Sequence, residues 1–210
     1  MKKTFLFAAL AALCLQAQAF EESFTTGDFA SAGTYATITL SDSQLLELEN
    51  TWTINIVATV NPSSPTTGYW VKDVLVTGAH NATDNYGAED GGFRFFVATS
   101  NHSNITPGTL VYTCPDQVET STGIIVADET PVSITLSHVL GEADTNVTIG
   151  YAGDTHTFTF TGLHGAFTQF SSNVPVSGGE ISVGITSPEP ATATLSLLAL
   201  AGLAARRKRH

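Results

Sequence analysis

Basic residues are almost absent from the interior of this 210-residue sequence. Between Phe20 and Pro188 the only cations are Lys72 and Arg94, against eighteen Asp and Glu residues, so two minus eighteen gives a formal charge of −16. A surface of this charge repels phosphate backbones and anionic lipid headgroups. We therefore exclude nucleic acid as a partner of the interior segment.

Long uncharged apolar runs are also absent, except at the two ends of the chain. Near the N-terminus, Lys2 and Lys3 precede an apolar run over residues 5–15, and Ala17 to Ala19 then form a small-x-small cleavage site. These three parts predict a signal peptide over residues 1–19, removed by signal peptidase between Ala19 and Phe20. We expect the protein to be exported.

Cysteine is scarce, because the chain has only Cys14 and Cys114. Removal of the signal peptide would take Cys14 with it, and a single remaining cysteine cannot form an internal disulfide. We expect Cys114 to be a small apolar residue in or beside a strand, with an intermolecular bridge as the alternative. The stability of the mature domain must then come from its core.

The second uncharged run covers residues 191–205, follows Pro188-Glu189-Pro190 and ends at the basic residues Arg206, Arg207, Lys208 and Arg209. As a helix it would span about 22 Å, which is short for a hydrocarbon core of about 30 Å. The positive-inside rule would keep the tail, residues 206–210, in the cytoplasm. We expect a short transmembrane helix that anchors the chain transiently in the inner membrane. A buried or amphipathic terminal helix is the alternative.

This order of a Pro-Glu-Pro triplet, an apolar segment and an Arg-rich end resembles the PEP-CTERM sorting signal of exported proteins in Gram-negative bacteria. The resemblance covers residues 187–210. It implies that Pro188, Glu189 and Pro190 are the motif recognised by an exosortase, a membrane-embedded, transpeptidase-like enzyme. It further implies that the segment is removed and the domain reaches the cell surface or the extracellular matrix.

Helical periodicity is missing from the interior, where period-two alternation dominates. In residues 52–60, Trp52, Ile54 and Ile56 fall on one face of a predicted strand. Similar strands are predicted over residues 132–136, 146–151, 156–160 and 180–185, and less regular ones over 35–40, 69–76, 93–99, 109–113 and 123–127. A tight hairpin is expected at residues 151–155. The pattern predicts an all-β domain over residues 20–186, an antiparallel β-sandwich rather than a barrel.

The order of these pieces resembles a concanavalin A-like or laminin-G-like jelly roll. The strand "TWTINIVATV" comes early, the hairpin pair "VSITLSHVLGEADTNVTIGYAGDTHTFTF" much later, and "EISVGI" closes the domain. The aromatic-x-Asn-Gly turn usual in that family is replaced here by Tyr151 to Asp154.

Catalytic motifs are missing as well. Retaining glucanases of the same fold need two carboxylates about 5 Å apart, typically written ExDxxE. The closest stretch here, Glu142 to Val147 in an expected loop, has valine at the last position. There is no Gly-x-Ser-x-Gly elbow, and the histidines lack zinc-binding spacing. We therefore expect no enzyme, with a glycoside hydrolase-like activity as the alternative.

Two features indicate binding instead. Oxygen ligands and glycines are dense in residues 84–92, where Asp84, Asn85, Glu89 and Asp90 could hold calcium; a solvated loop is the alternative. Exposed aromatic side chains could stack on a sugar ring, although burial in the core is the usual fate of tryptophan. The candidates for glycan contact are Tyr69, Trp70 and Tyr86.

Together these patterns predict an exported, non-catalytic protein of the cell surface or extracellular matrix. Its expected partners are signal peptidase and exosortase during processing, the inner membrane transiently, and an extracellular glycan afterwards. A purely structural matrix or adhesin component without a small ligand is the remaining alternative.

Overall fold

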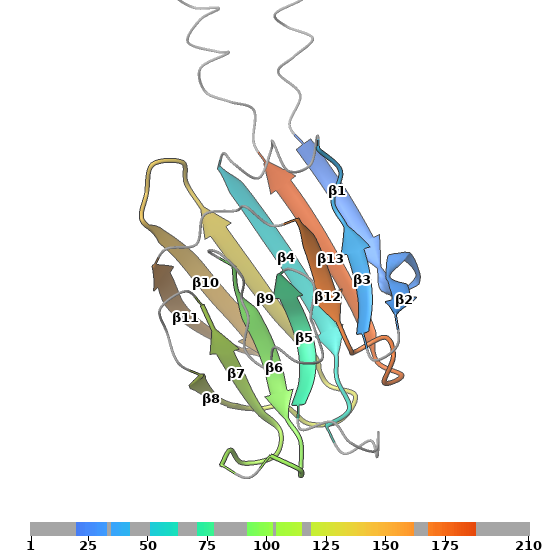
Figure 1. Cartoon of the computed structure of the whole chain (residues 1–210). Helices are drawn as coiled ribbons and strands as arrows, with labels where there is room; N and C mark the ends of the chain where they lie inside the picture. Colours follow the sequence, from blue (N-terminus) through green and yellow to red (C-terminus); the bar gives the residue numbers. More distant parts are fainter. Residues whose placement is uncertain are drawn as a thin grey trace, which may run out of the picture.

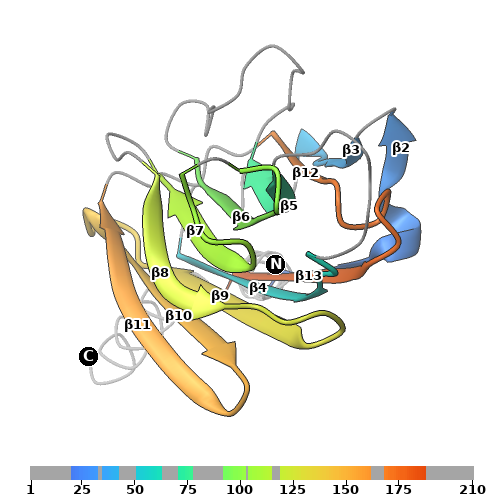
Figure 2. The ribbon, with the colours of Figure 1, turned by 90° about the horizontal axis from the view of Figure 1, so that it is seen from below.

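The computed structural model describes residues 20–32, 35–42, 51–62, 71–77, 92–102, 104–114, 119–161 and 168–187. Within these ranges the chain forms two antiparallel sheets that face each other as the two layers of a sandwich (Figures 1 and 2). The prediction of an all-β antiparallel sandwich is confirmed.

One layer is a six-stranded sheet in the order β1-β13-β4-β9-β10-β11. It comprises β1 (Phe20–Thr25), β13 (Glu180–Ser187), β4 (Trp52–Thr59), β9 (Pro131–His138), β10 (Asp144–Tyr151) and β11 (Asp154–Thr161). The predicted hairpin at residues 151–155 is confirmed, since Tyr151 pairs with Asp154. Ala152 and Gly153 between them have φ values of 51° and 91°, the conformation of a type I′ turn.

The other layer is a seven-stranded sheet in the order β2-β3-β12-β5-β6-β7-β8. It comprises β2 (Ala30–Ala32), β3 (Tyr35–Thr39), β12 (Gln169–Ser172), β5 (Val71–Thr77), β6 (Arg94–Ala98), β7 (Thr109–Thr113) and β8 (Thr120–Ile125). A 3-10 turn, η1 (Thr26–Asp28), connects β1 to β2 and so links the two layers.

The core lies between the layers and is built from the residues that alternation places inward. Trp52, Ile54 and Ile56 of β4 are each at most 1% exposed, while the alternate residues Asn55 and Val57 face solvent. Phe95 and Phe160 stack across the layers with their ring centroids 5.7 Å apart. Cys114 is buried directly after β7, so the expectation of a small apolar residue beside a strand is confirmed.

Three strands have no counterpart in the sequence prediction: β1, β2 and β12. β12 has no visible alternation because Phe170, Ser171 and Ser172 are all fully buried, so both of its faces lie inside the protein. β8 begins three residues earlier than predicted and ends at Ile125, and Gly123 within it has a φ of 78°. Asp144 and Thr145, expected in a loop, begin β10, and the rest of β10 matches the predicted strand over residues 146–151.

Candidate functional site

Most residues that the sequence singled out lie outside the described residues. This holds for Ala19, for the calcium candidates Asp84, Asn85, Glu89 and Asp90, and for the aromatic candidates Tyr69, Trp70 and Tyr86. It holds equally for Pro188, Glu189, Pro190, the predicted helix 191–205 and the basic residues Arg206, Arg207, Lys208 and Arg209. These assignments stay predictions.

The described residues do fix where the segment with the calcium candidates departs from the fold. Thr77 ends β5 and Phe93 precedes β6. Three hydrogen bonds join them, one of which runs from the Thr77 hydroxyl to the Phe93 carbonyl at 3.3 Å. The Thr77 N donates to the Phe93 carbonyl at 3.0 Å, and the Phe93 N donates to the Thr77 hydroxyl at 2.9 Å. Thr77 and Phe93 are therefore neighbours in the seven-stranded sheet.

Next to these two residues lies an ionic cluster. The Arg94 Nε donates to Asp73 Oδ1 at 2.6 Å, and the Tyr35 hydroxyl donates to Asp73 Oδ2. The Arg94 guanidinium also stacks on Phe96, 4.5 Å from the ring centroid. Asp73 is fully buried and Arg94 is 4% exposed, which is unusual for charged side chains.

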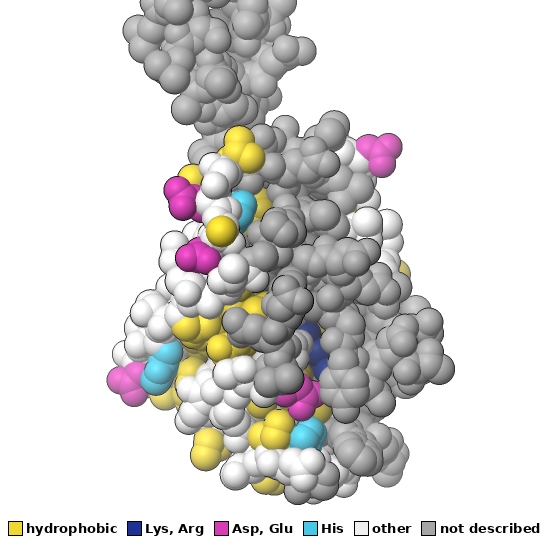
Figure 3. All heavy atoms as spheres, turned by 60° about the vertical axis from the view of Figure 1, so that its left-hand side comes forward, with side chains coloured by type: hydrophobic (Ala, Val, Ile, Leu, Met, Phe, Trp, Pro, Cys, Tyr) yellow, Lys and Arg dark blue, Asp and Glu magenta, His cyan; other side chains and the backbone are white. Residues whose placement is uncertain are grey.

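Burial and pairing act on the Arg94 guanidinium in opposite directions. Burial lowers the pKa of Arg94, whereas the charge of Asp73 and the hydrogen bond to it raise this pKa. The effect of the pairing is larger, so the pKa of Arg94 lies above its ordinary value. Burial lowers the pKa of Lys72, the other cation of the described chain. Figure 3 shows one side of the molecule, and on that side the dark blue of Lys and Arg side chains is visible in a single recess. This agrees with the burial of Lys72 and Arg94.

Neither a metal site nor a membrane span is found among the described residues. No group of three or more His, Cys, Asp or Glu side chains there could hold a metal ion. In the same ranges, no helix has the length and hydropathy needed to cross a bilayer. The predicted calcium loop and the predicted terminal helix both fall outside these ranges.

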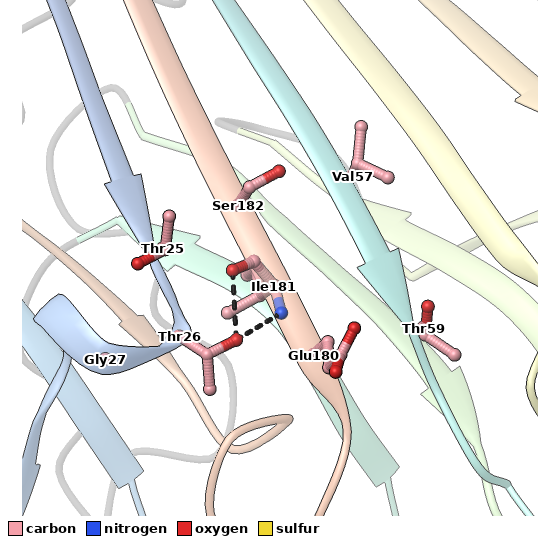
Figure 4. Close-up of a pocket in the computed structure, with 8 residues that line it drawn as sticks. All are labelled: Thr25, Thr26, Gly27, Val57, Thr59, Glu180, Ile181 and Ser182. Atoms are coloured by element: carbon pink, nitrogen blue, oxygen red, sulfur yellow. Dashed lines mark hydrogen bonds between the residues drawn. The ribbon is translucent and has the colours of Figure 1, made fainter.

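Two hollows open on the outer face of the six-stranded sheet. The first, with a volume of about 400 Å³, is lined by Thr25, Thr26, Gly27, Val57, Thr59, Glu180, Ile181 and Ser182 (Figure 4). Its wall is fixed by Thr26, whose hydroxyl accepts from the Ile181 N at 2.8 Å and donates to the Ile181 carbonyl at 3.1 Å. This pair of bonds ties η1 to the start of β13.

The second hollow, of about 520 Å³, lies farther along the same face. It is lined by Thr130, Pro131, Ser133, Gly150, Tyr151, Ala152, Gly153, Asp154 and Thr155. The Tyr151 hydroxyl accepts from the Ala127 N at 2.7 Å, which fixes its ring. The hollows adjoin where Val57 of the first pairs with Ser133 of the second. We call the two hollows together the cross-strand groove.

Sequence reasoning missed the cross-strand groove. Its lining consists of short groups of residues from six strands and their adjoining turns, which form no motif along the chain. The available signal was the outward set of each alternating strand, for example Asn55 and Val57 of β4, but alternation alone does not give the strand order.

Comparison with known proteins shows only distant similarity. No protein-family model matches the sequence, and no curated protein matches it significantly. Among solved structures, peanut lectin is 11% identical over 81% of this chain and 97% of its own, with a TM-score of 0.49. The basic lectin of winged bean is 9% identical over 81% of this chain and 100% of its own, with a TM-score of 0.46.

A third similar structure is the alginate lyase from Klebsiella pneumoniae. It is 12% identical over 67% of this chain and 59% of its own, with a TM-score of 0.36. These similarities concern the fold and assign neither a ligand nor an activity to this chain.

Proposed function

We propose that this chain is an exported, non-catalytic protein of the cell surface or extracellular matrix, processed at both ends, whose β-sandwich binds glycan. The observation that carries the proposal is the pairing of Phe20 with Ser187. Phe20 is the first residue after the predicted signal peptide, and Ser187 is the last residue before the Pro-Glu-Pro motif.

This pairing places Phe20 and Ser187, which border the two predicted processing segments in the sequence, at one end of the sandwich. Partners in an antiparallel ladder have their Cα atoms about 5 Å apart. Accordingly, β1 begins and β13 ends at the same end of the molecule, the upper end in Figure 1. Cuts before Phe20 and after Pro190 would both fall outside the paired strands, so processing would leave the sheet intact.

The same topology supports placing the binding surface away from the membrane. The cross-strand groove includes Thr25 and Ser182, which pair five residues along β1 and β13 from Phe20 and Ser187. Five residues of strand span about 17 Å. A chain held at its termini would therefore present the groove at the end remote from its anchor.

The spacing of carboxylates supports a binding role over hydrolysis. Glu180 of β13 and Asp154 of β11 line the groove, and four strand spacings separate their strands. Four spacings amount to about 19 Å, whereas glycoside hydrolysis needs carboxylates about 5 to 9.5 Å apart. In the nearest match to a glucanase motif, Val147 is buried in the core.

A glycan array followed by calorimetric titration of the full-length protein, with and without calcium, tests the binding role. We expect saturable binding with no release of reducing ends. Release of reducing ends would favour the glycoside hydrolase-like alternative, and absence of any binding would favour a purely structural matrix component. Loss of binding on chelation of calcium would support the predicted ligands in residues 84–90.

A further inference from the structure

We infer that the cross-strand groove binds a single extended, uncharged polysaccharide chain that runs perpendicular to the β-strands, about one sugar unit per strand. This inference rests on the proposed glycan-binding function and deepens it. It adds a site, a direction for the ligand and a ligand class to that function.

Strand register makes the two hollows continuous. Six residues, one from each strand, are linked by successive pairing across the whole sheet: Thr25, Ser182, Val57, Ser133, Gly150 and Thr155. The first three line one hollow and the last three line the other. Registered partners share a face of the sheet, so these residues form one floor.

The floor is open because its side chains are small. At Gly150 the missing side chain leaves room for the Ser133 hydroxyl, whose Oγ would lie 2.6 Å from a Cβ there. The Ser133 hydroxyl donates to the Gly150 carbonyl at 3.3 Å, which holds the two strands close at this point. A larger side chain at position 150 would close the middle of the second hollow.

The chemistry of the floor suits a sugar chain. Four of the six residues carry hydroxyl groups, which can donate and accept hydrogen bonds as sugar hydroxyls do. Val57, in the middle of the row, is 44% exposed and offers an apolar contact for the C–H face of a pyranose ring.

The charge of the residues that line the groove favours an uncharged polymer as the ligand. No residue of the floor is ionisable, and the charged side chains that line the hollows are the carboxylates Glu180 and Asp154. The interior segment around them has a formal charge of −16. An anionic polysaccharide would be repelled, whereas a neutral one meets no such barrier.

The size of the groove sets a chain length. Strands in a sheet lie about 4.8 Å apart, so the row from β1 to β11 is about 24 Å long. The strand spacing is close to the length of one sugar unit in an extended chain. We expect the groove to accommodate about five units, counted as one per strand spacing.

The test is a titration of the full-length protein with neutral β-linked gluco-oligosaccharides of two to seven units and with oligogalacturonates of the same lengths. We expect the affinity for the neutral series to increase up to about five units and then to level off. We expect the anionic series to bind at least about tenfold more weakly, because its carboxylates approach an anionic surface.

Two matched substitutions locate the binding site. Val57→Glu places a charge in the middle of the floor, and we expect at least about a tenfold loss of affinity for the longest neutral ligand. Ile125→Glu makes the same change at a 58% exposed position on β8, in the other sheet, and serves as the control. We expect it to bind within about twofold of the unaltered protein.

The outcomes separate this inference from the proposed function. If the unaltered protein binds no glycan, both are wrong. If it binds but Val57→Glu does not weaken binding, and Trp70→Ala does, the glycan-binding function stands and the groove is not the site. Equal affinity for the anionic series, or a dimer that Val57→Glu dissociates, would also overturn the inference.

Discussion

Among single residues, Asp73 has the most consequential environment. Its carboxylate is fully buried and accepts hydrogen bonds from both Arg94 and Tyr35. Removing one partner of a buried ion pair leaves the other charge uncompensated, which costs several kcal/mol. The pair therefore restricts which substitutions this part of the sheet tolerates.

We predict that Asp73→Asn lowers the free energy of unfolding by about 3 kcal/mol, because Arg94 stays charged and buried. Urea unfolding monitored by tryptophan fluorescence measures this difference. Asp154→Asn, at an exposed position, is the control and should change stability by less than about 0.5 kcal/mol. An Asp73→Asn protein as stable as the control would show that the pair contributes no more than a surface ion pair.

Gly179, just before β13, is a second residue with a specific steric role. A Cβ there would lie 2.4 Å from the Thr59 carbonyl oxygen and 2.7 Å from Val174 Cγ1. Gly184, within β13, is the matched contrast, because the closest atoms to its Cβ would be 4.0 Å away.

We predict that Gly179→Ala destabilises the protein by about 2 kcal/mol, since backbone must move to relieve the overlap. Gly184→Ala should be neutral or slightly stabilising, because it reduces the freedom of the unfolded chain. Thermal unfolding of both variants makes the comparison. Equal melting temperatures for the two would contradict the close packing at Gly179.

Among the strands, alternation carried most of the information that could be predicted from the sequence. β4, β9, β10 and β13 alternate between buried and outward residues, and all four were predicted. β11 was predicted as well, although Phe160 is its one buried residue. β12 was missed because both of its faces are buried, and β1 because "FEESFT" has no clear alternation and is held by pairing with β13. The cross-strand groove could not be predicted because it depends on strand order and register, as the pair Val57 and Ser133 shows.

The β10–β11 hairpin contains a residue that does not suit its conformation. Ala152 has a φ of 51°, which lies in the left-handed region. Residues with a Cβ adopt this conformation only at a cost in free energy. We predict that Ala152→Asn stabilises the protein by about 0.5 kcal/mol, because Asn-Gly is the preferred pair in a type I′ turn. Ala152→Val should destabilise the protein instead, and chemical unfolding measures both changes. A higher free energy of unfolding for Ala152→Val than for Ala152→Asn would contradict the turn assignment.

For the molecule as a whole, the arrangement of ends and faces connects the fold to the proposed function. The two ends of the described chain meet at one end of the sandwich, and the cross-strand groove lies toward the other. In such an arrangement, a chain anchored by its terminal segments would keep its binding face available during processing. The charge of the interior segment would discourage contact with anionic lipid.

The most direct test of this account is the intact mass of the protein recovered from its native host, compared between a wild-type strain and one lacking exosortase. We predict a wild-type product that begins at Phe20 and ends near Pro190, and a longer product that retains residues 191–210 in the mutant. A chain that keeps residues 1–19 and its C-terminus in both strains would contradict the account.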